Sequence, residues 1–225
     1  SSSSAASDVY KRQGMRRLEA QVARALALLQ TSEGDHRTAG ITLRKAIGQA
    51  ISCGDTMLVL DLDPGPDVDI AGCCEVALWL REVLDSVDLL GFAKTSGSKG
   101  MQMYVPLNTP HDYDHTSSFA LALGQLLAKR HPKRVLTEMT KAKRSGKVFV
   151  DWSQNARHKT TITPYSTRAR DRPTVSTPIS WDEVEAGAEG EPLVFDIDDV
   201  PARVEANGDL FADTLTLQQH LPKPA

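Results

Sequence analysis

Cysteines, aromatic residues and long apolar runs are all scarce in this sequence of 225 residues. Its three cysteines, two of them adjacent at Cys73 and Cys74, fit neither a disulfide framework nor a zinc-binding spacing, and a reducing cytoplasm suits them. Aromatic residues make up 5% of the chain, which argues against broad base stacking as a way to hold nucleic acid. No run of 18 apolar residues and no signal peptide is present, so we expect a soluble protein without a membrane partner.

Charge of one sign is concentrated in one stretch. The whole chain has a net charge of −3, yet residues 129–172 hold thirteen Lys and Arg against three Asp and Glu. A local basic face of this kind can hold a phosphate backbone even when the protein is slightly acidic overall. A solvated surface is the alternative interpretation, because the stretch spans several elements.

The order of patterns along the chain predicts an α+β fold, with a mixed or antiparallel sheet flanked by helices. Residues 1–14 are typical of a non-native or disordered leader, 15–56 of a helical segment of uncertain role, 57–215 of the main domain and 216–225 of a frayed tail. Within the main domain, Asp69 is expected to cap a helix whose apolar stripe runs from Val76 to Val87. We expect strands over 89–93 and 101–107, a helix over 116–129, and surface connections at 183–191 and 196–199.

The acidic pair Asp61 and Asp63 follows the apolar run of residues 57–60 and precedes Pro64-Gly65-Pro66. The run predicts a buried strand, in which side chains two apart share a face, so both carboxylates point the same way. Two ionised carboxylates side by side repel each other, and a hard divalent cation such as Mg²⁺ or Mn²⁺ removes that repulsion. A turn rich in Asp, Pro and Gly is the simpler interpretation of the same residues.

A glycine loop at 94–100 lies between the two strands expected next. Its glycines allow a close backbone approach to an anion, and Lys99 supplies a compact positive charge for phosphate, although the spacing is not that of a P-loop. An ordinary hairpin loop is the alternative. Further along, Asp151 ends the short apolar strand of 148–150 and can complete a three-acid site with the first pair; a turn-capping aspartate is the alternative there. Trp152 is expected either near that site or in the core.

With these segments in order, the chain resembles the polymerase domain of bacterial non-homologous end-joining ligase D, in the archaeo-eukaryotic primase superfamily. The resemblance covers roughly residues 57–215 and is carried by Val59–Pro66, Lys94–Gly100, Tyr104–Leu107 and Lys147–Asn155. It implies a DNA-directed nucleotidyltransferase that extends a primer 3′-hydroxyl by two-metal catalysis in end-joining repair. It also implies Mn²⁺ or Mg²⁺, DNA, nucleoside triphosphates, a ligase and an end-binding protein as partners, and a place at the bacterial nucleoid in the cytoplasm.

The resemblance further implies the residues of the site. The metal-binding and catalytic residues are Asp61, Asp63 and Asp151. The predicted nucleotide-binding residues are Ser96, Ser98, Lys99, Gln102, Arg144 and Arg168.

Two departures from the family pattern matter. Gln102 stands where the family usually has a histidine, and glutamine cannot carry a proton or charge, so we expect weaker triphosphate binding. Residues 1–56 lack recognisable features of the family's N-terminal region, which predicts an atypical or truncated start. A DNA- or nucleotide-binding module that has lost catalysis is therefore one alternative. A haloacid dehalogenase-type phosphohydrolase, which also places Asp-x-Asp after a buried strand, is another.

Overall fold

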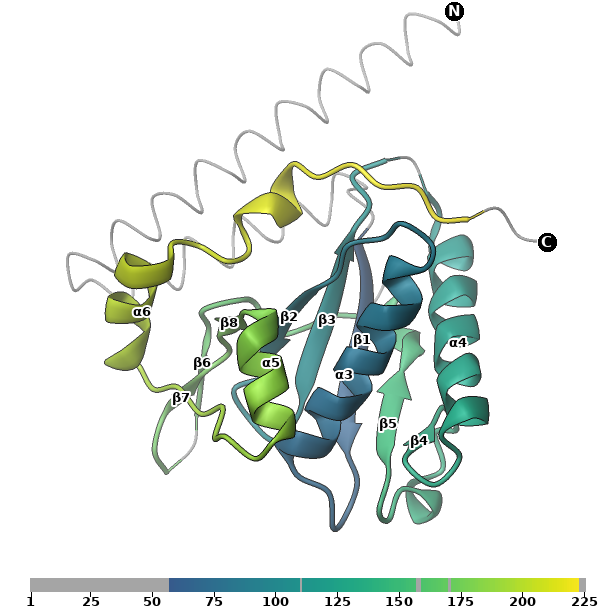
Figure 1. The fold of residues 1–225 in the computed structure, drawn as a ribbon, viewed down its shortest axis with the longest axis horizontal. Coiled ribbons are helices and arrows are strands. Elements are labelled where there is room, and N and C mark those ends of the chain that lie inside the picture. Colours follow the sequence, from purple (N-terminus) through teal and green to yellow (C-terminus); the bar gives the residue numbers. More distant parts are fainter. Residues whose placement is uncertain (1–56, 110, 157–158, 170, 223–225) are drawn as a thin grey trace, which may run out of the picture. The chain divides into compact units, whose positions relative to one another are not determined.

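The computed structural model describes residues 57–109, 111–156, 159–169 and 171–222. The leader expected at 1–14 and the helical segment expected at 15–56 lie outside these ranges. The described part of the chain is built on a six-stranded sheet with helices packed on one of its faces (Figure 1).

The six-stranded sheet has the order β4-β5-β1-β3-β2-β8. Every neighbouring pair is antiparallel except β4 and β5, which are parallel, so the mixed sheet expected from the sequence is confirmed. A separate two-stranded antiparallel sheet is formed by β6 and β7. The bounds are β1 Met57–Pro64, β2 Phe92–Thr95, β3 Met101–Pro106, β4 Val135–Leu136, β5 Val148–Asp151, β6 Thr167–Arg168, β7 Thr174–Val175 and β8 Pro178–Ile179.

The two faces of the central strand β1 have different environments. Leu58, Leu60 and Leu62 are fully buried in the main core, which lies between the sheet and the helices. The intervening residues Val59 and Asp61 point to the opposite face, as the two-residue period of a strand requires. Burying each leucine contributes about 1.5–3 kcal/mol to the stability of the fold, so the side of β1 that faces the helices determines the strand register. The side that carries Asp61 is not needed for this packing.

The helices α3 Ile70–Asp85, α4 Tyr113–Arg130 and α5 Trp181–Ala188 lie against that core (Figure 1). The Asp69 carboxylate accepts hydrogen bonds from the first-turn amides of Ala71 and Gly72, so the cap expected for α3 is confirmed. The remaining helical elements are α6 Asp199–Asn207 and the short 3₁₀ turns η1 Lys141–Lys143, η2 Trp152–Gln154 and η3 Ala212–Leu215. In the described ranges, no helix has both the length and the apolar character needed to cross a membrane.

Several local expectations were wrong. The acidic stretch 183–191 is not a surface connection, because most of it forms α5, which begins with a capping box between Ser180 and Glu183. The turn at 196–199 is present but leads into α6. Helix α4 begins at Tyr113 rather than near residue 116, and the apolar stripe of α3 ends at Leu84, with Val87 38% exposed.

The tail is also more ordered than expected up to Pro222. The Gln219 side chain accepts a hydrogen bond from the Leu90 amide and donates to the Leu90 and Pro106 carbonyls, while its backbone amide donates to the Leu107 carbonyl. Leu221 is buried as well. Paired polar groups of this kind hold a segment that composition alone predicts to fray.

Candidate active site

Four polar side chains form a row across four strands on the face opposite the helices. Asp61 of β1 lies directly opposite Asp151 of β5 on one side and Gln102 of β3 on the other, and Gln102 in turn lies opposite Lys94 of β2. Residues directly opposite each other in a sheet project from the same face. Asp63 shares this face two residues along β1. The sheet therefore brings all three predicted metal-binding aspartates to one face.

The raised pKa of Asp61 shows that the ionised form of this carboxylate is unfavourable beside the other two aspartates unless a positive charge is present. Burial, followed by the neighbouring charge of Asp63, raises the pKa of Asp61 from 3.8 to about 7; a hydrogen bond from Gln102 opposes the shift and Asp151 adds to it. Burial also raises the pKa of Asp63, against the nearby Arg144 guanidinium. A divalent cation would offset both desolvation and mutual repulsion, so the donor set suits a hard metal ion.

The Asp151 carboxylate also takes part in a local turn. One of its oxygens accepts hydrogen bonds from the Ser153 amide at 2.9 Å and the Ser153 hydroxyl at 2.6 Å, and the other accepts from Gln154 Nε2 at 3.2 Å. The carboxylate thus caps η2, as the turn-capping alternative predicted, while lying next to Asp61. Within the described ranges no three His, Cys, Asp or Glu side chains converge as a ready-made ion site. Sharing of an ion by the three aspartates stays a prediction.

Arg144 lies beside the acidic pair. Its guanidinium stacks over the Phe149 ring at 3.7 Å, donates to the Met139 carbonyl at 3.3 Å, and approaches Asp63 Oδ2 at 4.0 Å. The side chain is 19% exposed. The structure therefore places this predicted nucleotide-binding residue against a predicted metal ligand, where it offsets part of the negative charge.

The glycine loop is a closed hairpin connection between β2 and β3. The Ser96 amide donates to the Gly100 carbonyl at 2.9 Å, and the Ser98 amide donates to Ser96 Oγ at 3.2 Å. Gly97 has a φ of +64°, and a Cβ there would lie 2.8 Å from the Ser176 amide nitrogen. Both the turn and the close approach need glycine at this position.

The predicted nucleotide-binding residues divide into two groups. Ser96 is buried, and its carbonyl accepts a hydrogen bond from Arg168 Nε at 3.1 Å, so Arg168 braces the loop. Ser98 and Lys99 are exposed at the tip. Gln102 is 3% exposed and interacts with Asp61 and with the Tyr104 hydroxyl rather than facing solvent. Their roles toward a nucleotide stay predictions.

Lys94, which completes the polar row, is buried, and no sequence pattern predicted this. Its ammonium is fully buried and donates to Ser176 Oγ at 2.6 Å, and that hydroxyl donates to the Thr95 carbonyl at 2.8 Å. Burial lowers the pKa of Lys94 to about 7, against the opposing effect of Asp61. A lysine in a glycine-rich loop is usually solvated, and only the pairing of β2 with β3 and β8 encloses this one.

Asn155 is a second residue that the sequence pattern did not single out for this role. Its amide oxygen accepts from the Val59 amide and its amide nitrogen donates to the Val59 carbonyl, each at 2.8 Å. The side chain thus continues the β1 ladder beyond the last β5 pair, Asp61 with Asp151. Trp152, in the same turn, packs partly buried against the main core, so it belongs to the core rather than to the site.

The described chain thus combines a largely antiparallel sheet that has helices on one face with three aspartates on the other face. The chain belongs to the family described as the LigD primase-polymerase domain, whose model matches residues 21–211. That match begins earlier than residue 57 and includes most of the segment in which the sequence showed no family feature. LigD polymerase domains are nucleotidyltransferases and in general metal-dependent.

Individual relatives agree with this assignment. The chain is 45% identical over 157 residues to the multifunctional non-homologous end joining protein LigD of Mycolicibacterium smegmatis, a match that covers 70% of this chain and 20% of that protein. It is 34% identical over 169 residues to the bifunctional LigD of Bacillus subtilis, covering 75% and 27%. The chain therefore spans about a fifth to a quarter of these relatives.

A solved structure has the same fold. The polymerase domain from Mycobacterium tuberculosis ligase D, in complex with DNA, matches with a TM-score of 0.68 and 41% identity. The match covers 73% of this chain and 56% of that one. The family assignment also excludes the haloacid dehalogenase alternative, because residues 21–211 match the LigD primase-polymerase family and the chain has the fold of a LigD polymerase domain.

Proposed function

We propose that this chain is a DNA-directed nucleotidyltransferase that adds nucleotides to a primer 3′-hydroxyl during bacterial non-homologous end joining. The observation that carries the proposal is the row of Asp151, Asp61 and Gln102, with Asp63 beside it, on one sheet face of a LigD-type polymerase domain. Its substrates would be a primer–template or broken DNA ends and nucleoside triphosphates, and a ligase and an end-binding protein would act with it at the nucleoid.

Asp61, Asp63 and Asp151 would hold Mn²⁺ or Mg²⁺. When bound, such ions lower the pKa of the attacking hydroxyl and neutralise charge on the triphosphate. The chain itself contributes orientation: Gln102 donates to Asp61, Ser153 and Gln154 fix Asp151, and Arg144 lies beside Asp63. These contacts hold the carboxylates in place before substrate arrives, which is how a site lowers the reorganisation needed in the transition state.

Primer extension on a gapped template, with Mn²⁺ and with ribo- or deoxyribonucleotides in separate reactions, tests the proposal. Template-directed extension supports it. DNA binding without extension in either nucleotide set would instead favour a module that has lost catalysis, an alternative motivated by Gln102 in place of the family's usual histidine.

Lys99 is expected to matter for nucleotide affinity. Its side chain is exposed at the tip of the glycine loop, next to the strand that carries Gln102. Lys99→Ala should raise the KM for nucleotide roughly tenfold to a hundredfold with a small change in kcat, because a charge-assisted phosphate contact contributes about 1.5–3 kcal/mol. Steady-state nucleotide titration measures both constants.

Lys129→Ala is the matched control, since Lys129 is exposed near the end of α4 and should leave KM unchanged. Gln102→His, which restores the usual family residue, should lower the KM. If Lys99→Ala behaves like Lys129→Ala, the loop is a hairpin connection without a phosphate contact.

Lys94 is expected to weaken metal binding. It lies two strands from Asp61, about 10 Å at ordinary strand spacing, where a positive charge opposes a divalent cation by roughly 1–3 kcal/mol before screening by salt. Lys94→Met removes the charge and leaves an unbranched side chain that is one atom shorter, so the Kd for Mn²⁺ should fall about three- to tenfold. Titration of free Mn²⁺ by electron paramagnetic resonance gives this constant.

Lys99→Met serves as the comparison for Lys94→Met, because it removes an exposed lysine from the adjoining loop without changing the polar row. An equal effect of both substitutions, or weaker binding in Lys94→Met, would contradict the role assigned to the buried ammonium.

A further inference from the structure

Three consecutive carbonyl oxygens of the glycine loop accept hydrogen bonds from side chains of residues 168–176. The bonds run from Ser176 Oγ to the Thr95 carbonyl at 2.8 Å, from Arg168 Nε to the Ser96 carbonyl at 3.1 Å, and from Thr174 Oγ1 to the Gly97 carbonyl at 2.5 Å. The three donors belong to β6, to β7 and to the residue that follows β7. Together these side chains form a clamp on the loop, and the polymerase proposal gives no role to Thr174 or Ser176.

The loop lies directly on the clamp at Gly97. A Cβ at this glycine would lie 2.8 Å from the Ser176 amide nitrogen and 3.0 Å from Arg168 Cγ. The Thr95 amide also donates to the Thr177 carbonyl at 2.9 Å. The two segments are therefore in van der Waals contact, so the conformation of the loop depends on the segment beneath it.

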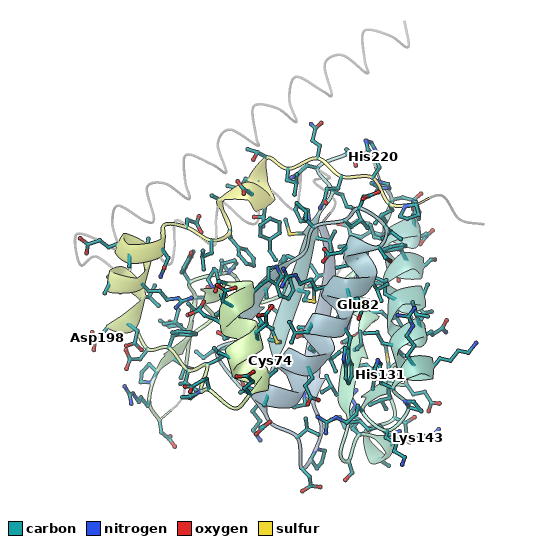
Figure 2. All side chains as sticks on the ribbon, in the orientation of Figure 1. Cys74, Glu82, His131, Lys143, Asp198 and His220 are labelled. Atoms are coloured by element: carbon teal, nitrogen blue, oxygen red, sulfur yellow. The ribbon has the colours of Figure 1, made fainter. Side chains whose placement is uncertain are left out.

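The clamp itself is anchored on its far side. β7 pairs with β6, the Val175 amide donates to the Phe195 carbonyl at 2.8 Å, and Thr174 forms an isolated bridge with Asp196. This outer segment leads into α6, whose N-cap residue Asp198 is labelled in Figure 2. Anchoring of this kind holds the Thr174 hydroxyl in place, as a residue that positions another group requires.

The clamp also sets the direction of the loop amides. In a planar trans peptide unit the C=O and N–H bonds point in opposite directions, and the described residues contain no cis peptide bond. Bonding of the three carbonyls on the clamp side therefore turns the amides of Ser96, Gly97 and Ser98 to the other side. The Ser96 amide donates to the Gly100 carbonyl and the Ser98 amide to Ser96 Oγ, whereas no described residue accepts from the Gly97 amide. That amide is available to an anion, two residues before Lys99.

We propose that Thr174 and Ser176 are positioning residues for the nucleoside triphosphate. With Arg168 they hold the glycine loop in the conformation that offers the Gly97 amide and Lys99 to phosphate. This inference rests on the nucleotide-binding role proposed for the loop. Without the clamp, the peptide unit after Gly97 can rotate, because glycine has access to most backbone conformations, and nucleotide binding must then also order the loop at a cost in affinity.

Thr174→Val and Thr174→Ser test the clamp in the full chain. Valine keeps the shape of threonine and removes the hydroxyl, whereas serine keeps the hydroxyl. In Thr174→Val the Kd for a nucleoside triphosphate with Mn²⁺ should rise about three- to tenfold, and hydrogen exchange of the amides of residues 96–100 should become faster. Thr174→Ser should keep the parent's values. Isothermal titration without primer measures the Kd, so the result does not depend on turnover.

Thr167→Val is the matched control, because it removes an exposed hydroxyl from the same two-stranded sheet and should change neither quantity. Primer extension separates the clamp from the polymerase proposal. In a parent that extends primers, Thr174→Val should raise the KM for nucleotide with little change in kcat. Absence of extension together with a raised Kd in Thr174→Val would contradict the polymerase activity and support the clamp.

Three results would overturn the clamp. The first is nucleotide binding by Thr174→Val as tight as by Thr167→Val, whether or not the loop exchanges faster. The second is a loss of affinity in Thr174→Ser equal to that in Thr174→Val. The third is a parent protein that binds no nucleoside triphosphate in the presence of Mn²⁺.

Discussion

Asp61→Asn is expected to abolish primer extension while leaving the protein folded and able to bind DNA. Asparagine has the same shape and keeps a partner for Gln102, but it removes the charge that would hold a divalent cation. Loss of metal stabilisation should lower extension by several orders of magnitude. Single-turnover extension with Mn²⁺ measures the loss, and fluorescence anisotropy with labelled DNA measures binding.

The same substitution should not destabilise the metal-free protein. Because the folded-state pKa of Asp61 is raised from 3.8 to about 7, its contribution to stability is fully present below pH 3.8 and is lost as the pH rises through about 7. The uncharged amide removes that loss, so the Tm at neutral pH without metal should equal or exceed the parent's.

Glu82→Gln, at an exposed carboxylate on the helix side of the molecule, is the matched control and should leave extension unchanged. Near-normal extension in Asp61→Asn would remove Asp61 from the chemistry. Lost extension together with a large fall in Tm would mean that its role is structural.

Gly65→Ala is expected to have the largest effect on stability. Gly65 sits in the turn after β1, where its amide donates to the Lys147 carbonyl at 2.9 Å. A Cβ at this position would lie 1.8 Å from the Arg144 carbonyl oxygen, so the loop that carries Arg144 must move. A backbone clash cannot be relieved by a rotamer change, and we expect a loss of about 3 kcal/mol or more in the free energy of unfolding.

Urea unfolding gives this free energy, and Gly208→Ala provides the comparison. Gly208 has a φ of +70°, but a Cβ there would meet nothing within 4 Å. Its ψ is −169°, and because this combination of φ and ψ is essentially confined to glycine, the substitution should cost about 1–3 kcal/mol from backbone strain alone. Equal losses in the two variants would show that the close approach at Gly65 is not what requires glycine.

Local patterns in the sequence predicted a large part of the fold. The alternation around Asp61 and Asp63 placed both on one strand face, and Asp69 with the apolar stripe after it predicted α3. The glycine-rich segment does connect two strands, although β2 spans Phe92–Thr95 rather than 89–93 and so includes Lys94 and Thr95 of the expected loop. These features depend on neighbours within a few residues, so hydrophobic period, capping and turn chemistry are enough to predict them.

Other expectations failed because distant segments decide them. The acidic stretch after residue 183 looked solvent-facing, yet one face of α5 packs into the main core. The C-terminal segment looked frayed, yet Gln219 is tied to backbone more than 100 residues away. Composition indicates whether a segment tolerates contact with water, but both of these segments pack against other parts of the protein.

What the sequence by itself determined is which residues can share a face: Asp61 with Asp63, and Gln102 with Tyr104. What only the tertiary structure decided is which faces meet, because a two-residue period fixes the side of a strand but not its partner or register. Long-range pairing set Asp151 opposite Asp61 and enclosed Lys94 at the end of the row. The same long-range packing brought His220 to the start of α4, about a hundred residues along the chain from its neighbours there. No local sequence pattern predicts that these two segments lie together.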